Sequence, residues 1–462
     1  MQPYALTTEV FCFEHLGQHV AYAPLKRVLL VVNSAAANIL AQLANGTFAG
    51  PDDQNLGVLS TLVDLGLVNG TPEEVHQDGN GQFRPTNTTL FLTSACNLRC
   101  VYCYASGGDK PRHMTWPVIK AAVDFVAENA KVIETGSFGL SFHGGGEPTI
   151  AWEMLTQATL YARQLAVDKG LKCQCALATN GVLSNAQAEW IAANIDDVNV
   201  SVDGLEEVHN QLRPLRAGGG SFAAVFRTIQ LLSRAGRPFG LRMTIARDNV
   251  AQVPEAVRFF CQAASPRVIH LEPVFRCGRC AVEGVPSPSI EEFLSVFRVA
   301  RDIADQRGIH LYYSGARFPN IATIFCQAAG MSFTVVADGN VTACYEVADS
   351  DDPRAATFFF GRYDDAAGAF VFDPDKLKNL ARLTVDKIPF CRDCLCKYHC
   401  AGDCPAKRMA AFDDGLPVAA SGRCRITQEL TKDQIIRALH DGSQTMRIVS
   451  REHAIAGETQ HG

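Results

Sequence analysis

Hydrophobic and polar positions follow a repeating order between residues 89 and 274, in which short apolar segments alternate with longer amphipathic ones. The short segments have the length of buried strands, and the longer ones carry apolar residues at helical spacing. Six such pairs predict an α/β fold, a partial (β/α)6 TIM-like barrel with its active site at the C-terminal ends of the strands. The predicted strands span 89–95, 138–144, 173–179, 198–202, 240–246 and 268–274.

The pattern differs on either side of this repeat. Before it, the strand-like runs VFCFEHL and HVAYAPL precede two helix-like runs, SAAANILAQLANG and LGVLSTLVDLGLVNG, that both stop at glycine, which predicts an N-terminal winged-helix-like domain. After it, the chain is rich in loops and cysteines, and a last helix over TKDQIIRALHDGSQTMRIVS leads to a polar tail that we expect to be disordered at its end. We therefore expect divisions at 1–85, 86–310, 311–440 and 441–462.

Composition narrows the class of protein. A net charge of −6 and a pI of about 6.1 give no electrostatic footprint for nucleic acid. The most apolar early run is interrupted by Asn33, Ser34 and Asn38, and no secretory signal precedes it, so we expect a cytoplasmic protein that does not span a membrane. In a reducing compartment, 17 cysteines are better explained as metal ligands than as disulfides, and ten of them fall into two tight patterns.

The first pattern is CNLRCVYCYA, residues 96–105, at the end of the first predicted strand. Three thiolates on one short loop can ligate three irons of a cubane cluster and leave the fourth iron open for chemistry. The alternative is a structural zinc site, which usually has four ligands, and Tyr102 and Tyr104 are poor zinc ligands.

This loop resembles the cluster-binding loop of radical S-adenosylmethionine (radical SAM) enzymes. The resemblance implies that Cys96, Cys100 and Cys103 hold a 4Fe–4S cluster and that Tyr102 packs near the cluster and the adenine. The open iron would chelate the methionine part of SAM, and one electron would cleave SAM to a 5'-deoxyadenosyl radical that abstracts hydrogen from the substrate.

The other strand ends agree with this resemblance. HGGGEPT follows the second strand, and in the family such a glycine-rich element binds the methionine amino group. The segments ATNGVL and SVDGLEEVHNQLR resemble the family's contacts to ribose and carboxylate, although each also reads as a plain turn. Arg242 and Glu272 are costly to bury unpaired, so they are candidates for cofactor or substrate contacts or for salt bridges. The cofactor-binding residues implied are Tyr102, Gly144, Gly145, Gly146, Glu147, Thr179, Asn180, Ser201 and Arg213.

The second cysteine pattern lies between residues 326 and 424 and reads C-x12-G-x4-C, then C-x2-C-x5-C-x3-C, then a final cysteine. By itself it also fits a pair of structural zinc sites. Together with a radical SAM core it resembles the iron–sulfur SPASM domain, which implies two auxiliary 4Fe–4S clusters. One would be ligated by Cys391, Cys394, Cys400 and Cys424, and the other by Cys326, Cys344 and Cys404.

Two positions depart from the related anaerobic sulfatase-maturating enzymes. Their further cysteine ligand, six residues before the first array cysteine, is Asn320 here, which leaves Cys277, Cys280 or an open iron to complete the cluster. Their aspartate base, directly after the equivalent of Cys344, is Tyr345 followed by Glu346, so Glu346 is the candidate catalytic base.

The N-terminal runs are similar to the small PqqD-like recognition domain, to which a leader peptide adds as a strand; an accessory domain that only packs on the barrel is the alternative. The leading hypothesis is a radical SAM/SPASM oxidoreductase that cross-links or oxidises a ribosomally made precursor peptide or protein. A reductant such as flavodoxin or ferredoxin would supply electrons. Formylglycine formation in a sulfatase and a zinc-bearing binding protein without catalysis are the alternatives.

Overall fold

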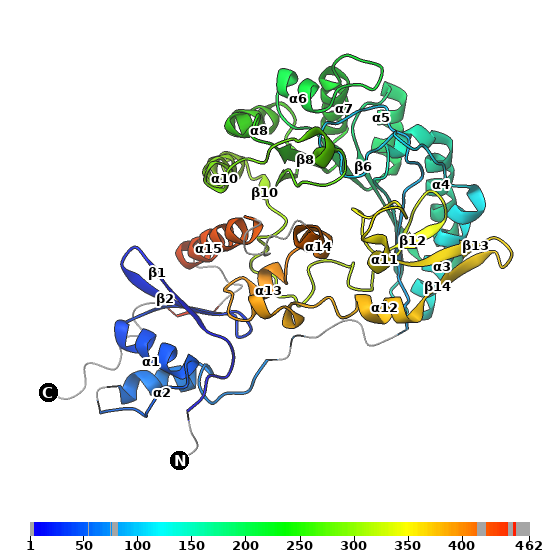
Figure 1. Cartoon of the computed structure of the whole chain (residues 1–462). Coiled ribbons are helices and arrows are strands. Elements are labelled where there is room, and N and C mark those ends of the chain that lie inside the picture. The colour runs from blue at the N-terminus through cyan, green and yellow to red at the C-terminus, as the bar shows by residue number, and fades with distance from the viewer. Residues whose placement is uncertain are drawn as a thin grey trace.

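The computed structural model describes residues 4–53, 55–73, 75, 82–413, 422–441 and 447–449 (Figure 1). Its strands form one sheet of four strands and one of eleven. In Figure 1 the N-terminal elements, in blue, lie apart from the cyan and green barrel, and the orange and red C-terminal helices lie between them.

The small sheet contains three antiparallel strands, β1 (Phe11–His15), β2 (Gln18–Ala23) and β3 (Val28–Val32), which precede the helices α1 (Ser34–Ala44) and α2 (Leu56–Asp64). The Asn33 side chain caps α1 by accepting a hydrogen bond from the Ala36 amide at 2.8 Å. Because side chains alternate between the two faces of a strand, one face of the sheet packs on the two helices. The other face presents Val20, Tyr22 and Leu29 to Ile435 near the C-terminus.

A short strand from the other end of the chain, β15 (Arg447–Val449), extends this sheet by pairing parallel with β3. The sequence had suggested helix over this segment and a tail from residue 441. The helix α15 (Arg423–Asp441) instead begins earlier and ends at Asp441. That prediction was wrong at 447–449, where two β-branched residues in succession favour a strand. The other residues of the predicted tail lie outside the described residues.

The barrel prediction is confirmed, since all six predicted strands are present and hydrogen-bond in parallel to their neighbours. A seventh parallel strand, β10, follows them. The strands are β4 (Asn87–Leu90), β5 (Ser137–Phe142), β6 (Lys172–Thr179), β7 (Asp197–Ser201), β8 (Phe239–Ile245), β9 (Val268–Pro273) and β10 (His310–Tyr312).

Helices connect these strands and cover the outside of the sheet (Figure 1). Ser184 and Ser289 each form a capping box at a helix start, and Gly170 ends another helix in the left-handed conformation. The helices are α3 (Trp116–Val132), η1 (Pro148–Ala151), α4 (Trp152–Lys169), α5 (Asn185–Asn194), α6 (Glu206–Leu212), α7 (Phe222–Arg234), η2 (Val250–Gln252), α8 (Val253–Ala263), α9 (Arg279–Glu283) and α10 (Ile290–Asp305).

The large sheet continues past the barrel into the region that the sequence suggested was mostly loops. The strand β11 (Thr334–Val335) pairs parallel with β4, and the antiparallel strands β12 (Asn340–Thr342), β13 (Phe359–Asp364) and β14 (Ala369–Phe372) follow in order. Strands of two to six residues are too short to produce a clear periodicity, which is why the sequence did not indicate them.

Short helices hold the cysteine-rich segment beside the barrel. They are α11 (Ala355–Phe358), α12 (Pro374–Leu380), η3 (Val385–Lys387), η4 (Pro389–Cys391), α13 (Lys397–Cys400) and α14 (Pro405–Asp413). Of the helices in the part of the chain that the structure describes, none has both the length and the apolar content to cross a membrane.

Candidate active site

A cavity of about 610 Å³ lies at the C-terminal ends of the barrel strands and extends into the barrel. It brings together side chains as far apart in sequence as Thr89 and Lys407, and many of them meet because parallel strands end at one edge of the sheet. Every residue that the sequence suggested for the first cluster and for SAM lines this cavity: Cys96, Cys100, Tyr102, Cys103, Gly144, Gly145, Gly146, Glu147, Thr179, Asn180, Ser201 and Arg213. Glu346, the candidate base, lines it as well.

The three thiols of the first loop each have an N–H group near the sulfur. Cys96 Sγ accepts from the Leu98 amide at 3.5 Å and from Asn180 Nδ2 at 3.8 Å. Cys103 Sγ accepts from the Gly107 amide at 3.4 Å, and Cys100 Sγ lies 3.9 Å from Arg213 Nη1.

Burial raises the pKa of Cys96 to about 11 and that of Cys100 to about 12, so both carry a proton while no metal is bound. Ligation would release these protons, and the N–H donors would then face thiolate sulfur.

The glycine-rich loop packs directly on the cysteine loop. A Cβ atom at Gly146 would lie 2.0 Å from the Ala95 carbonyl oxygen, so only glycine allows this approach. The Glu147 amide donates to the same carbonyl at 2.8 Å. The chain after β5 is thereby fixed against the loop that carries Cys96.

Glu147 joins this loop to the end of β6. Its carboxylate accepts from the hydroxyls of Thr149 and Thr179, each at 2.8 Å, and from the Asn180 amide at 2.7 Å. Burial raises the pKa of Glu147, and the four hydrogen bonds that it accepts act in the opposite direction. Glu147 therefore orients Thr179 and Asn180 toward the cavity.

Arg213 lies where the fourth strand end was expected to contribute a cation, but it pairs with Asp203 of the same chain, whose carboxylate it contacts at 2.8 Å. The Tyr102 hydroxyl donates to the same Asp203 oxygen, and the Thr244 amide donates to the other at 2.9 Å. The guanidinium also lies over the Tyr102 ring, 5.4 Å from its centre. Asp203, which the sequence places either in a turn or at a strand end where a polar group needs a partner, thus positions two predicted site residues.

Arg279 is a site residue that the sequence reading missed. It is 4% exposed, and its guanidinium donates to the carbonyl oxygens of Cys100 at 3.0 Å and Gly107 at 3.1 Å and to Asp109 at 2.9 Å. Gly278 has φ +52°, and a Cβ there would lie 2.2 Å from the Tyr104 carbonyl oxygen. The segment after β9 therefore holds the cysteine loop as the glycine-rich loop does; the signal in the sequence is the second arginine of the FRCGRC run.

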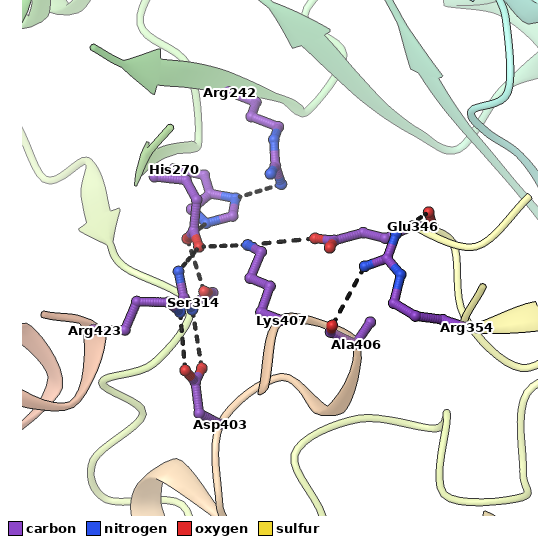
Figure 2. A network of polar contacts seen from close by, with 10 residues as sticks. Arg242, His270, Ser314, Glu346, Arg354, Asp403, Ala406, Lys407 and Arg423 are labelled. Atoms are coloured by element: carbon purple, nitrogen blue, oxygen red, sulfur yellow. Dashed lines mark hydrogen bonds and ion pairs between the residues drawn. The ribbon is translucent and has the colours of Figure 1, made fainter. Parts of the chain in front are cut away.

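A network of buried charges closes another wall of the cavity (Figure 2). Glu272 on β9 accepts from Arg423 at 2.8 Å and from Ser314 at 2.7 Å, and it pairs with Lys407 at 3.2 Å. Lys407 also pairs with Glu346 at 3.3 Å. Lys407 and Arg423 hold the pKa of Glu272 well below its usual range, against the effect of burial. Glu272 therefore forms salt bridges, which was one of the two alternatives that the sequence left open.

The cysteines of the second pattern do not line the cavity, and their division into two ligand sets stays a prediction. Burial raises the pKa of Cys326, Cys344 and Cys404, and the Glu346 carboxylate acts in the same direction on each. Cys424 has Cys391 and Cys394 as charged neighbours, and Cys400 has Cys424. Among the described residues, no three His, Cys, Asp or Glu side chains converge on the position of a single metal ion.

The two substitutes for the fourth ligand differ in position. Cys280 is buried in a small apolar cluster, where its thiol donates to the Val285 carbonyl at 3.6 Å. Cys277 lines the cavity, and Glu346 and Lys407 are among its charged neighbours. Asn320 is exposed, and its carbonyl accepts from His399 at 2.8 Å. Of the two cysteines, Cys277 is thus the one on the side of Glu346.

These groups fit a 4Fe–4S cluster with one open iron and a bound SAM. Three thiols lie on one loop with N–H groups near each sulfur, and glycine backbone and polar strand ends lie beside them in the same cavity.

Comparisons with known proteins identify the central domain. Residues 90–260 match the model of the radical SAM superfamily. The sporulation killing factor maturation protein SkfB of Bacillus subtilis is 27% identical over 278 residues, 59% of this chain and 63% of SkfB. The mycofactocin maturase MftC of Mycolicibacterium smegmatis is 29% identical over 289 residues, 60% of this chain and 68% of MftC. The chain thus spans about two thirds of the length of these relatives.

The fold is also similar to a solved structure, that of native anSMEcpe with bound AdoMet. The TM-score is 0.59 at 18% identity, and the match covers 77% of this chain and all of that one. The match to this superfamily model implies a 4Fe–4S cluster and SAM as cofactors. The matched segment contains the cysteine loop and the ends of the first five barrel strands, and on this evidence residues 90–260 form a radical SAM domain.

Proposed function

We propose that this chain is a radical SAM maturase that modifies a side chain or α-carbon of a ribosomally made peptide, by cross-linking or oxidation. The observation that carries the proposal is the cavity, which joins the cysteine and glycine-rich loops to the Lys407–Glu346 pair in one space. The maturases SkfB and MftC support the substrate class, since both are similar to this chain over more than half of its length.

The chain's own residues would hold and orient the cofactors. When bound, the cluster and SAM supply a 5'-deoxyadenosyl radical upon one-electron reduction, and this radical removes hydrogen from the substrate. Cys96, Cys100 and Cys103 would ligate the cluster, and the backbone at Gly144–Gly146 leaves room for the methionine end of SAM. Glu346, held by Lys407 at 3.3 Å, would accept the proton that the substrate loses.

The second cysteine pattern would hold two auxiliary 4Fe–4S clusters. Cys391, Cys394, Cys400 and Cys424 would ligate one, and Cys326, Cys344 and Cys404 the other. Their role would be to accept the electron that the oxidised substrate releases, with a flavodoxin or ferredoxin as external reductant. The proposal is supported by the charged neighbours of the thiols, since Glu346 raises the pKa of Cys326, Cys344 and Cys404, and Cys391 and Cys394 raise that of Cys424.

The small N-terminal sheet would recognise the precursor peptide by adding it as a strand, in which main-chain hydrogen bonds give affinity and side-chain pockets give register. Its two edges are β1 and β15, and the chain's own β15 covers β3. A peptide can therefore pair with β1 directly, or with β3 after β15 is displaced.

Anaerobic reconstitution tests the proposal. We expect about twelve irons per chain, absorbance near 400 nm and 5'-deoxyadenosine from SAM and reductant. The variant with Cys96, Cys100 and Cys103 changed to Ala should lose about four irons and all 5'-deoxyadenosine, whereas Cys12→Ser, at an exposed cysteine outside both patterns, should change neither.

The substrate class is tested with two peptides, one encoded by a short reading frame beside the gene and one carrying a sulfatase maturation site. Mass loss by hydrogen removal in the first peptide supports the proposal. Formylglycine in the second alone, or colourless protein without iron, overturns it.

A further inference from the structure

Arg242 is the one charged side chain of the cavity wall without an opposite charge or a full set of hydrogen bonds, within the part of the chain that the structure describes. The others pair or are satisfied as follows: Arg213 with Asp203, Asp197 with Arg267, Glu272 with Lys407 and Arg423, Glu346 with Lys407, and Glu147 with four hydrogen-bond donors. Arg242 makes one hydrogen bond, to His270, and its side chain is exposed to the cavity.

His270 fixes the direction of this guanidinium (Figure 2). Arg242 Nη1 donates to His270 Nδ1 at 3.2 Å, and His270 Nε2 lies 3.2 Å from Glu272. Since Nδ1 accepts, the imidazole is neutral and Nε2 donates to Glu272. Burial lowers the pKa of His270, which agrees with the neutral form. The Tyr312 ring stacks on the imidazole with centres 4.5 Å apart and keeps it in place.

The network behind His270 does not need the charge of Arg242. Glu272 already has two cations, Lys407 and Arg423, of which Arg423 also forms a two-pronged contact with Asp403 at 2.9 Å. Arg242 therefore contributes no necessary neutralisation there. Four of its five N–H donors remain for a ligand, in the planar arrangement that suits a carboxylate.

Arg242 lies on β8 between Ser201 of β7, a residue expected to bind SAM, and His270 of β9. Its guanidinium hydrogen-bonds to His270 and is therefore held on the β9 side. Glu272 on β9 also lines the cavity, and Lys407 links it to Glu346, the group that we propose as the base for the substrate. An anion at Arg242 thus lies on the substrate side.

We propose that Arg242 binds a carboxylate of the peptide substrate, either an Asp or Glu side chain or the C-terminal group, and so sets which residue of the peptide enters the cavity. This inference rests on the proposed function, because carboxylates are the anionic groups that an unmodified peptide carries. SAM also has a carboxylate, so the experiment must separate the two sources.

The test uses capped amino acids as probes on the reconstituted holoenzyme with SAM. Acetyl-glutamic acid α-amide carries one carboxylate, and acetyl-glutamine α-amide is its neutral isostere. We expect the dissociation constant of the acidic probe to be at least about tenfold higher for Arg242→Gln than for the wild type, because the variant loses a two-pronged charged contact. The neutral probe should bind both proteins equally, and Arg242→Lys should retain part of the preference.

Two outcomes overturn the inference. Equal binding of the acidic and neutral probes to the wild type overturns it, as does a loss confined to the dissociation constant of SAM in Arg242→Gln. Arg247→Gln, at an exposed arginine outside the cavity wall, serves as the matched control and should bind both probes as the wild type does. If the wild type forms no 5'-deoxyadenosine, the proposed function fails; if it does and the probes bind alike, only the role of Arg242 fails.

Discussion

Replacing Arg279 with alanine should loosen the cysteine loop without disturbing the barrel. The guanidinium donates to two backbone carbonyls, those of Cys100 and Gly107, and it is 4% exposed. A hydrogen bond from a charged donor contributes about 1.5–3 kcal/mol, so the two together contribute about 3–6 kcal/mol. The third contact, to Asp109, adds little because that carboxylate is 40% exposed. Water can replace part of the lost hydrogen bonding, so we take the lower end of this range. We expect Arg279→Ala to reduce the free energy needed to open the cysteine loop by about 3 kcal/mol.

A loss of about 3 kcal/mol corresponds to roughly a hundredfold more frequent opening of the loop. Hydrogen exchange measures this directly, because several amides of the loop are hydrogen-bonded, among them Arg99 to Pro214, Val101 to Leu212 and Gly108 to Ser94. In Arg279→Ala the peptide spanning 96–109 should exchange about a hundredfold faster, and iron should pass to a chelator faster from the reconstituted protein. Peptides from β6 and α4 should not change.

Two variants control the experiment. Arg276→Ala removes an exposed arginine from the same segment and should leave exchange in 96–109 unchanged. Arg279→Lys keeps the charge but not the fork of donors and should fall between the two. Exchange of 96–109 within twofold of the wild type in Arg279→Ala would refute the reasoning, since the carbonyl contacts would then contribute nothing to holding the loop.

Three further predictions concern other parts of the chain. Burial lowers the pKa of His209 to about 4, below its value of about 6.5 in the unfolded chain. The free energy of unfolding that depends on the neutral imidazole is therefore present above pH 6.5 and is lost as the pH falls from 6.5 to 4, by up to about 1.4 kcal/mol per pH unit. Denaturant unfolding at pH 7 and pH 5 should show a smaller pH dependence in His209→Gln than in the wild type. Lys407→Met removes the cation between the carboxylates of Glu272 and Glu346, so it should lower the free energy of unfolding by about 3–5 kcal/mol and abolish peptide modification. Lys407→Arg should retain most of the stability. Equal unfolding midpoints for Lys407→Met and the wild type would contradict this prediction. Ending the chain at Asp441 removes β15 and frees the edge of β3. If the precursor peptide pairs with β3, a titration should show a higher affinity for the shortened protein. An unchanged affinity would place the peptide elsewhere.

The sequence was sufficient for the parts of the site that follow strands in a regular order. The cysteine and glycine-rich loops and the polar groups after β6 and β7 each come directly after an apolar segment, and the parallel order of the strands brings them to one edge. Their roles as ligands of cluster and SAM, and those of the array cysteines, stay predictions.

The missed residues act through contacts that no local pattern records. Arg279 contacts a carbonyl 179 positions earlier in the chain, and Arg423 contacts Glu272 across 151 positions. Neither has a spacing, a cap or a periodicity that would mark it, because a long-range ion pair depends on how whole segments pack. The same holds for β15, whose partner strand lies at the other end of the chain. Asp203 was visible in the sequence, but its contact with Tyr102 requires the fourth strand end and the cysteine loop to be adjacent, which only the folded barrel provides.

The pairing of β11 with β4 has a consequence for how the chain can be divided. β4 is the first barrel strand, and on the side away from β5 its backbone amides and carbonyls are hydrogen-bonded by the segment that begins at Phe333. A fragment that stopped at residue 310 would leave that side of β4 as an exposed edge beside Leu90 and Phe91, which are buried in the whole chain. Exposed apolar edges pair with other molecules. The barrel alone should therefore aggregate, and expression of the second cysteine pattern in the same polypeptide is a condition for obtaining the first in monomeric form.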